Sequence, residues 1–449
     1  MIGSTKLLNT LSALTKRSKA DATSVFAEAR TCRVLRFAQG RIHQDLVQES
    51  LHVSITTRLD HRIGVASTET LDRVGLARGL NAAIEIARHA RAAKVVPELP
   101  SGHRLLATHD HVPATSAVSA VRMVDTIRRL FHFCQGLGVE LAGSSMTAEE
   151  ERVVVNSRGV ACYAASTVSG LKLVTMRKGL RGFAGGVHPD VRKLDAETLL
   201  ERALAPCLLR HAPVSLPIGT YEVILEPEAV AELLVWLGYI TFGAKQLKER
   251  TSAFAGRLGD TVAAPSVTIV DDGTDADGLR LPFDAEGTLK QRVLLIERGR
   301  AAGVVYDTMH GALYGRPSTG HALTPGDTEG PLPMNLFLES GTSSREEMIR
   351  RCERGLLIPR FHYVNGLLGP RDTLMTGLTR EGACLIENGK IRAPIATLRF
   401  TQSALEALSH VKGISKARER VADPAQDPGC VVAPTIHLAK FRFTGRSDS

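Results

Sequence analysis

Residues 361–391 read FHYVNGLLGPRDTLMTGLTREGACLIENGKI, a stretch in which short apolar runs alternate with glycine-containing turns. Asn388-Gly389 is the dipeptide most typical of a two-residue β-hairpin turn. Gly369 followed by Pro370 indicates a rigid corner, because proline fixes one backbone dihedral angle. The stretch therefore predicts antiparallel strands joined by tight turns.

The polar side chains of this stretch are candidates for a binding surface. They are His362, Asn365, Arg371, Asp372 and Thr376. A lone histidine in a turn-rich segment more often forms a structural hydrogen bond than binds a ligand, so both interpretations stay open at this point. Cys384 lies in the apolar run ACLIE with no cation beside it, which predicts a buried thiol rather than a nucleophile.

The rest of the second half follows the same strand-and-turn pattern. GTYEVIL (219–225) predicts a strand, and the apolar run after Pro227 predicts a buried helix. RVLLIERGRAAGVVYD (292–307) predicts a hairpin that turns near Arg298 and Gly299. Ser343 and Ser344 each precede a glutamate by three residues, as in the capping box that begins a helix. The second half is therefore predicted to be a mainly antiparallel sheet with a few helices.

The first half mixes sheet and helix. Alternating apolar and polar residues between positions 21 and 60 predict a small sheet, and 151–179 predict further antiparallel strands. Thr70 is a candidate cap for one helix, a second helix should end at Gly136, and Pro206 should kink or end a third. The chain is therefore predicted to be α+β, with an N-terminal domain at 1–100, a central domain at 101–212 and an antiparallel β-rich C-terminal domain at 213–449.

Composition excludes several classes of protein. The longest apolar run, LLVWLGYITF, is about half of the ~20 residues that cross a bilayer, so no membrane span is expected. Seven scattered cysteines without a C-x-x-C pair favour reduced thiols, and with no signal-peptide pattern we expect a cytoplasmic protein. The formal charge of +9 permits an acidic partner, but aromatic residues make up only 4% and no nucleic-acid-binding motif occurs.

Most common catalytic patterns are missing from the sequence. It contains no G-x-S-x-G elbow, no phosphate-binding G-x-x-x-x-G-K-[ST] loop and no H-E-x-x-H. A helical zinc site needs two imidazoles about one turn apart, and no two of the 15 histidines are separated by three to five residues. His109 and His111 would share one side of an extended strand, but a metal there would need a third ligand from elsewhere.

Motifs along most of the chain resemble those of the TldD/PmbA family, also called modulators of DNA gyrase. The stretch 361–391, followed by LRFTQSALEAL (398–408), resembles the C-terminal signature of that family. Further similar segments occur in the family's order: GTYEVILEPEAVAELL (219–234), SAFAGRLGD (252–260), VTIVDDGT (267–274), LPFDAEGT (281–288), LLIERG (294–299) and STGHA (318–322). GRIHQDLVQES (40–50) through GVASTETLD (64–72) is a weaker match.

The resemblance implies which type of subunit this is. TldD-type chains resemble metalloproteases with H-E-x-x-x-H on a helix, and PmbA-type chains, also called TldE, lack that motif and pair with the first type. Here the corresponding segment is PEAVAELLVWLGYITFGAKQL (227–247), which contains no histidine. The resemblance therefore implies a PmbA/TldE-type subunit without zinc of its own, whose TldD-type partner holds the zinc and cuts unfolded peptides in a groove enclosed by both subunits.

Residues 361–377 are then expected to line that groove or the subunit interface, or else only to fix a corner of the sheet. Two other functions stay open at this stage. A stand-alone metallopeptidase with an atypical site would cleave peptides as the isolated protein. The family's older name and the positive charge suggest a DNA- or gyrase-associated binding protein. Such a protein would bind DNA with steep salt dependence.

Overall fold

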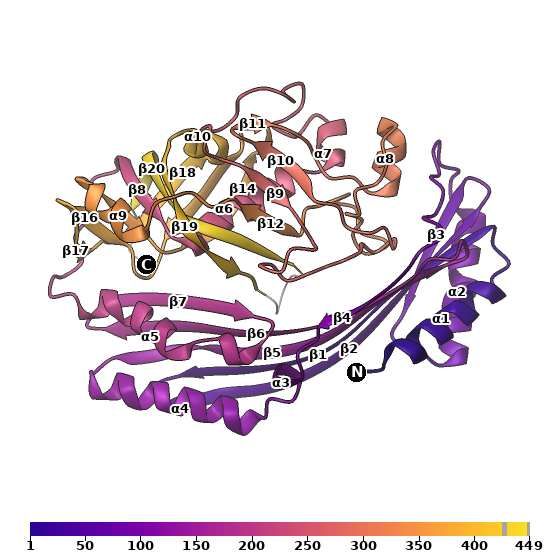
Figure 1. Ribbon diagram of the computed structural model, residues 1–449, viewed down its shortest axis with the longest axis horizontal. Helices are drawn as coiled ribbons and strands as arrows, with labels where there is room; N and C mark the ends of the chain where they lie inside the picture. Colours follow the sequence, from indigo (N-terminus) through magenta and orange to yellow (C-terminus); the bar gives the residue numbers. More distant parts are fainter. Residues whose placement is uncertain (424–428, 447–449) are drawn as a thin grey trace.

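The computed structural model describes residues 1–423 and 429–446. Within them, one seven-stranded and one thirteen-stranded sheet are formed by the first and second halves of the chain, with helices packed on both. Figure 1 shows the first sheet as a long curved layer that underlies the second half. The α+β prediction is confirmed. No helix in the described ranges is long and apolar enough to cross a membrane.

The N-terminal sheet is built from unusually long strands. Its strand order is β3-β2-β1-β5-β6-β4, and β7 also pairs with β6. The strands are β1 (Ala22–Ala38), β2 (Arg41–Leu59), β3 (Arg62–Thr68), β4 (Arg104–Asp110), β5 (Glu140–Asn156), β6 (Ala161–Arg177) and β7 (Leu180–His188). Since β1 pairs with β5, residues on both sides of position 100 share this one sheet.

Helices cover the outer face of this sheet at both ends. They are α1 (Ser4–Arg17), α2 (Arg73–His89), α3 (Pro113–Ser116), α4 (Ala120–Gly136) and α5 (Ala196–Leu204), with the short 3-10 turns η1 (Val191–Lys193) and η2 (Ala205–Leu208). The leucines of α1 and α2 form one apolar cluster, and α4 and α5 contribute to another. The predicted end at Gly136 is confirmed. Pro206 lies in η2, so the preceding helix ends before it.

The predicted cap of α2 is wrong. Asp72, not Thr70, is the N-cap, and its carboxylate accepts hydrogen bonds from the backbone N–H groups of Val74 and Gly75. The Thr70 hydroxyl instead donates to the Asp72 carboxylate at 2.5 Å. A carboxylate is preferred at this position because it satisfies free amide groups and opposes the positive end of the helix dipole.

The C-terminal sheet is mixed rather than purely antiparallel, because β8 pairs with β13 and β12 with β20 in parallel. Its strands are β8 (Gly219–Leu225), β9 (Ile269–Asp271), β10 (Val293–Glu297), β11 (Arg300–Ala301), β12 (Asn335–Leu338), β13 (Arg354–Ile358), β14 (Phe361–Gly369), β15 (Leu374–Thr379), β16 (Cys384–Glu387), β17 (Lys390–Pro394), β18 (Leu398–Ser403), β19 (Val411–Val421) and β20 (Cys430–Arg446). Its helices are α6 (Pro227–Ile240), α7 (Ala244–Lys248), α8 (Thr308–Tyr314), α9 (Arg345–Arg351) and α10 (Ala404–Ser409), and η3 spans Pro370–Asp372.

The stretch 361–391 forms two hairpins, β14–β15 and β16–β17. Asn388 and Gly389 both have positive φ, 49° and 70°, as a type I′ turn requires. Cys384 is 2% exposed in β16, and burial raises the pKa of its thiol to about 12. The hairpin and the buried thiol are both confirmed. The Ser344 capping box that begins α9 is confirmed as well.

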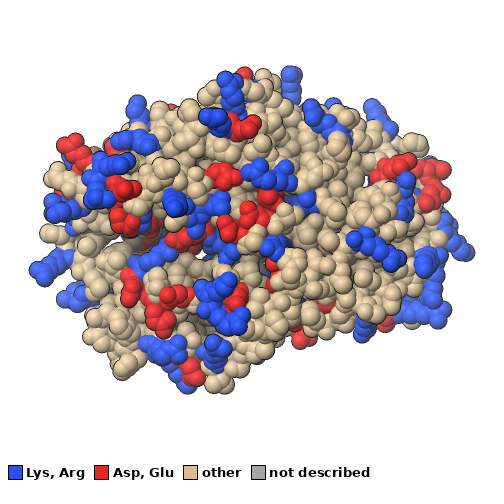
Figure 2. Space-filling view, viewed as in Figure 1, with Lys and Arg blue, Asp and Glu red and all other residues tan. Residues whose placement is uncertain are grey.

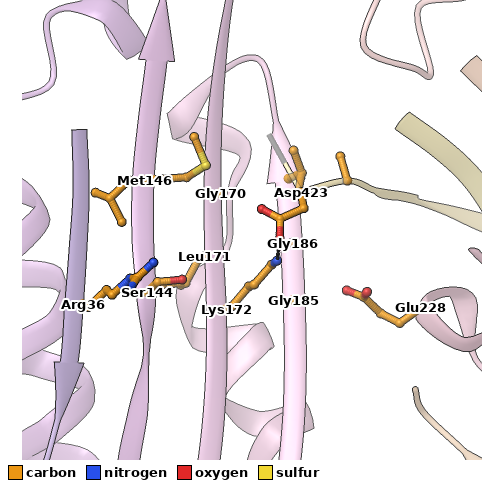
Figure 3. Close-up of a pocket in the computed structure, with 13 residues that line it drawn as sticks. Arg36, Ser144, Met146, Gly170, Leu171, Lys172, Gly185, Gly186, Glu228 and Asp423 are labelled. Carbon is orange, nitrogen blue, oxygen red and sulfur yellow. Dashed lines mark hydrogen bonds and ion pairs between the residues drawn. The ribbon is translucent and has the colours of Figure 1, made fainter. Parts of the chain in front are cut away.

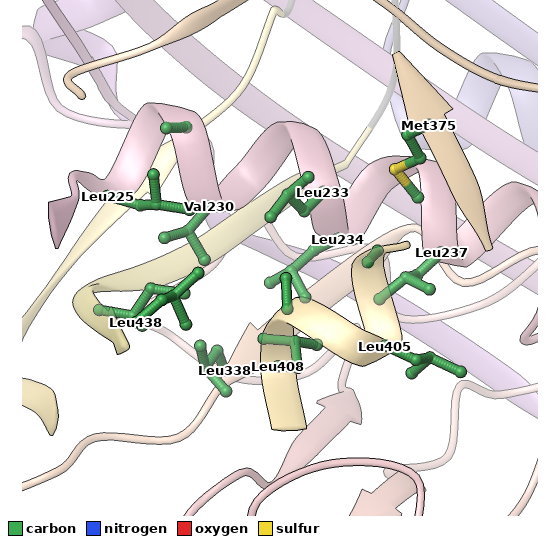
Figure 4. Close-up of a cluster of buried hydrophobic side chains, with 14 of the residues drawn as sticks. Leu225, Val230, Leu233, Leu234, Leu237, Leu338, Met375, Leu405, Leu408 and Leu438 are labelled. Atoms are coloured by element: carbon green, nitrogen blue, oxygen red, sulfur yellow. The ribbon is translucent and has the colours of Figure 1, made fainter. Parts of the chain in front are cut away.

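Nine of the 14 residues of helix α6 are buried. Leu234 and Leu237 are fully buried, and Figure 4 shows them directed toward leucines of the surrounding elements, among them Leu408 and Leu438. Pro227 occupies the first turn, where its missing N–H costs no intrahelical hydrogen bond. The predicted buried helix is therefore confirmed, and its position is fixed by a continuous apolar core.

Candidate functional site

A cavity of about 120 Å³ lies between the two halves of the molecule. Its floor is the inner face of four neighbouring strands, β1, β5, β6 and β7, and its roof is the first turn of α6 together with the residues that follow β19. Figure 3 shows Arg36, Ser144 and Lys172 on the strand side and Glu228 on the helix side. In Figure 2 the surface is hollowed between the two halves, with acidic and basic side chains at the rim.

The floor of the cavity contains three glycines, Gly170, Gly185 and Gly186, which let side chains above the sheet approach its backbone closely. A Cβ atom at Gly185 of β7 would lie 2.5 Å from Glu228 Oε1, so any larger residue would force the carboxylate to move. A Cβ atom at Gly170 of β6 would lie 3.1 Å from Met146 Cγ. Glycine at position 185 is therefore required for the Glu228 carboxylate to occupy its place above the sheet.

Two carboxylates of α6, Glu228 and Glu232, are one helical turn apart, so they share one side of the helix. Both are only partly exposed. Burial raises the pKa of Glu228 to about 7, although the charges of Lys172 and Arg360 act in the opposite direction. The pKa of Glu232 is also raised by burial, against the same two cations. Among the described residues neither carboxylate has a hydrogen-bond partner.

Ion pairs and a cation–π contact join the two halves beside the cavity. Lys172 Nζ of β6 donates to Asp423 Oδ2 at 2.8 Å, as the dashed line in Figure 3 marks. The Arg360 guanidinium lies 4.2 Å from the centroid of the Phe183 ring on β7, and it also pairs with Glu381. These cations keep the cavity close to electrical balance while its acidic side chains stay partly desolvated.

The polar residues predicted as candidates lie elsewhere. His362, Asn365, Arg371, Asp372 and Thr376 belong to the β14–β15 hairpin and its connecting turn, and none of them lines the cavity. Asn365 Oδ1 accepts from the Leu367 amide, and Thr376 donates its hydroxyl proton to Phe400 O. His362 stacks obliquely against Tyr363, and Arg371 and Asp372 are exposed. The structure thus places these residues together on one exposed hairpin.

The predicted pairing of His109 and His111 finds no metal-binding geometry in the described residues. His111 Nε2 lies 2.5 Å from Glu149 Oε1, whereas His109 lies 3.3 Å from the Asp110 carboxylate. One group of three metal-ligating side chains does occur in the described part of the chain, and it consists of Glu222, Cys352 and His437. It lies within the C-terminal half, on elements β8, the end of α9 and β20.

Sequence reasoning missed the two carboxylates of α6. The prediction for segment 227–247 depended on its lack of histidine and on its leucines, and it assigned no function to the acidic residues of the segment. The available signal was the spacing of Glu228 and Glu232, four residues apart in an otherwise apolar helix. Lys172 and Gly185 carried no local signal, because only the tertiary fold brings β6 and β7 under α6.

Comparisons with known proteins identify the family. The model of the PmbA/TldA metallopeptidase C-terminal domain matches residues 218–445, half of the chain. This chain therefore belongs to the PmbA/TldD metallopeptidase family. A metalloprotease TldD homologue of Haemophilus influenzae is 29% identical over 247 residues, which is 54% of this chain and 50% of that protein. A homologue from Buchnera aphidicola is 30% identical over 170 residues, 36% of this chain and 34% of that protein. These matches span half or less of the relatives' length.

Solved structures show that the fold extends over nearly the entire chain. TldE from Thermococcus kodakarensis superposes with a TM-score of 0.87 at 20% identity, covering 97% of this chain and all of that one. A candidate modulator of a DNA gyrase from Thermotoga maritima gives a TM-score of 0.85 at 17% identity, covering 98% of this chain and all of that one. At this level of identity the likeness establishes the fold.

The raised pKa of Glu228 predicts a pH-dependent stability. Between about pH 4.5 and 7 the unfolded chain loses this proton while the folded chain keeps it, so the wild-type protein loses stability as pH rises. Glu228→Gln removes the titrating carboxyl group and, with it, this loss of stability at higher pH. We expect the free energy of unfolding of the variant, relative to wild type, to rise by about 1–2 kcal/mol from pH 5 to pH 8, measured by urea denaturation.

Glu353→Gln, at an exposed position, is the matched control and should show no such trend. A difference between Glu228→Gln and wild type that stays constant from pH 5 to pH 8 would contradict the assignment of a desolvated carboxyl group at the cavity.

Proposed function

We propose that this chain is a PmbA/TldE-type subunit that assembles with a TldD-type metallopeptidase and contributes no catalytic zinc. The observation that carries the proposal is the composition of α6 beside the cavity. TldD-type chains are expected to have H-E-x-x-x-H on this helix, and residues 227–232 here read P-E-A-V-A-E. No residue from 227 to 247 is a histidine, so this helix offers no imidazole to a metal ion.

The residues in the first turns of α6 are a poor set of zinc ligands. Proline has no donor atom, and Pro227 is buried in the first turn of α6. Glu228 and Glu232 supply two carboxylates without a nitrogen or sulfur ligand, whereas protein zinc sites are dominated by histidine and cysteine. The raised pKa of Glu228, at about 7, also leaves much of this carboxyl group protonated near neutral pH. Helix α6 therefore keeps a defined position in the fold but offers no set of side chains suited to bind zinc.

The cavity supports a role in holding an extended peptide. Strand β7 borders it through Gly185 and Gly186 and pairs with β6 alone among the described strands. A strand with one unpaired edge is able to receive a further strand, and such pairing uses backbone groups irrespective of side-chain sequence. An unfolded peptide paired with this edge would lie beside β7 in the plane of the sheet, next to Gly185 and Gly186 and to the cavity that they border.

An exposed apolar surface on the second half supports a partner subunit. We define the hairpin patch as the exposed apolar side chains of β14 and the neighbouring part of α6: Val235, Tyr239, Tyr363, Leu367 and Leu368. The two elements pack tightly, since a Cβ atom at Gly366 would lie 2.6 Å from Trp236 Cε3. Tyr363 is 81% exposed and has a φ of 50°, a strained backbone conformation for a residue other than glycine. Strain of this kind at an exposed apolar residue is typical of a functional surface and supports a binding role for the hairpin patch.

The hairpin patch adjoins the polar residues predicted from the sequence as interface candidates. His362 and Asn365 lie on β14 within the patch, and Arg371 and Asp372 form the turn at its end. Apolar side chains surrounded by polar ones are typical of protein–protein interfaces. We therefore assign these residues to the subunit interface rather than to the peptide cavity.

Assembly is tested by co-expression with an affinity-tagged TldD-type protein from the same organism. We expect both chains to elute together from the affinity column and to migrate as one species in size-exclusion chromatography with light scattering. The tagged partner expressed with an unrelated protein of similar size is the control. Two separate species at micromolar concentration would contradict the proposed function.

The position of the interface is tested with a charge-introducing variant. Leu367→Asp combined with Leu368→Asp places two carboxylates in the hairpin patch. We expect the dissociation constant for the partner to rise by at least about tenfold, so that less of the variant co-elutes with the partner. His362→Ala with Arg371→Ala should weaken it less. Val121→Asp changes an equally exposed apolar residue on α4 and should leave assembly intact. Undiminished binding by the double aspartate variant would move the interface elsewhere.

A further inference from the structure

Three side chains of different chemical type converge within the C-terminal half. A carboxylate oxygen of Glu222 on β8, the Cys352 sulfur at the end of α9 and a ring nitrogen of His437 on β20 all lie within 4.8 Å of one another. His437 Nε2 and Glu222 Oε1 are 2.5 Å apart. Oxygen, sulfur and nitrogen donors in one cluster are the set that Zn²⁺ accepts, and no other group of three occurs in the described ranges.

The scaffold around these donors holds them in place. Glu222 and His437 project from strands that pair with each other, and Gly355 on β13 faces Glu222 across a parallel ladder. A Cβ atom at Gly355 would lie 2.6 Å from Cys352 Sγ, so glycine is what allows the sulfur to approach the sheet. The Cys352 amide is bonded to the last turn of α9, which fixes the backbone at the sulfur. The ligands therefore come from three rigid elements.

The protonation states suit a metal at two of the three positions. Burial lowers the pKa of His437 despite the neighbouring carboxylate, so the imidazole is neutral at physiological pH. The pKa of Glu222 is lowered overall, because hydrogen bonds from Lys412 and His437 outweigh the effect of burial. Burial and the Glu222 charge raise the pKa of the Cys352 thiol to about 12, so this proton must leave when a metal binds.

Solvent reaches the cluster from one side only. Cys352 is fully buried and the His437 side chain is 4% exposed, whereas Glu222 is 23% and Lys412 46% exposed. Lys412 Nζ lies 3.0 Å from the Glu222 oxygen and occupies the entrance. A long, half-exposed lysine is able to turn into solvent, which opens a path to the three donors.

We propose that Glu222, Cys352 and His437 bind one Zn²⁺ ion, which ties β8, β20 and the end of α9 together. Zinc displaces one proton and one ammonium from the cluster. The Cys352 thiol releases its proton to solvent. The imidazole proton, which faces Glu222 from Nε2, moves to Nδ1 so that Nε2 binds the ion, and the Lys412 ammonium moves outward. The thiolate and the carboxylate then balance the double positive charge of the ion, and water completes four-coordination at the solvent side.

This site is separate from the cavity, because none of its three ligands lines the cavity, and it does not depend on the proposed function. The full-length chain stripped with a chelator and titrated with Co²⁺ provides the test. A thiolate bound to Co²⁺ gives a near-ultraviolet charge-transfer band, which we expect to saturate at one equivalent and to be displaced by Zn²⁺. Release of one proton should make the apparent affinity rise about tenfold per pH unit near neutrality.

Variants distinguish a metal site from a hydrogen-bonded cluster. Cys352→Ser should abolish the band, whereas Cys384→Ser, a buried cysteine of the same apolar cluster, should retain it. Lys412→Ala removes the competing ammonium from a half-exposed position and should tighten Co²⁺ binding several-fold. Absence of the band in the wild-type chain, its persistence in Cys352→Ser, or an affinity unchanged by Lys412→Ala would each overturn the proposal, and the last variant decides even if Cys352→Ser fails to fold.

Discussion

The burial of one side of α6 is the constraint on which the rest of the account depends. Leu234 and Leu237 are fully enclosed by the apolar core of the C-terminal half, so the helix has only one rotational position about its axis. That position directs the first turn toward the N-terminal sheet and places Glu228 over Gly185. The leucines therefore decide which residues meet the cavity, although they take no part in binding.

A fold held in this way is able to keep its shape whichever polar groups the cavity side of α6 carries. The core of α6 imposes no requirement on the residues at its cavity side beyond fit, and acidic side chains fit there once Lys172 and Arg360 lie nearby. These acidic side chains are partly removed from water, which disfavours their charged form and raises the pKa of Glu228. Under the proposed function, such a helix would shape one wall of a peptide groove without supplying a metal ion, and the partner subunit would hold the zinc.

The sequence predicted local structure better than it predicted the site. The Asn388-Gly389 hairpin, the Ser344 capping box and the buried apolar helix all have signals within a few residues, and all are confirmed. Helix α1 was not anticipated, and the parallel pairing of β8 with β13 depends on residues far apart in the chain. The cavity also depends on residues far apart in the chain, because Lys172 and Glu228 come together only when the two sheets pack against each other.

Peptide hydrolysis by separated and combined subunits tests the central claim most directly. A fluorogenic unstructured peptide is incubated with this chain alone and with the reconstituted pair, each with and without a chelator. The account predicts no cleavage by this chain alone, and cleavage by the pair that is lost when the partner's H-E-x-x-x-H is disabled. Chelator-sensitive cleavage by the isolated chain that disappears in Glu228→Gln would contradict it, because α6 would then hold an active site.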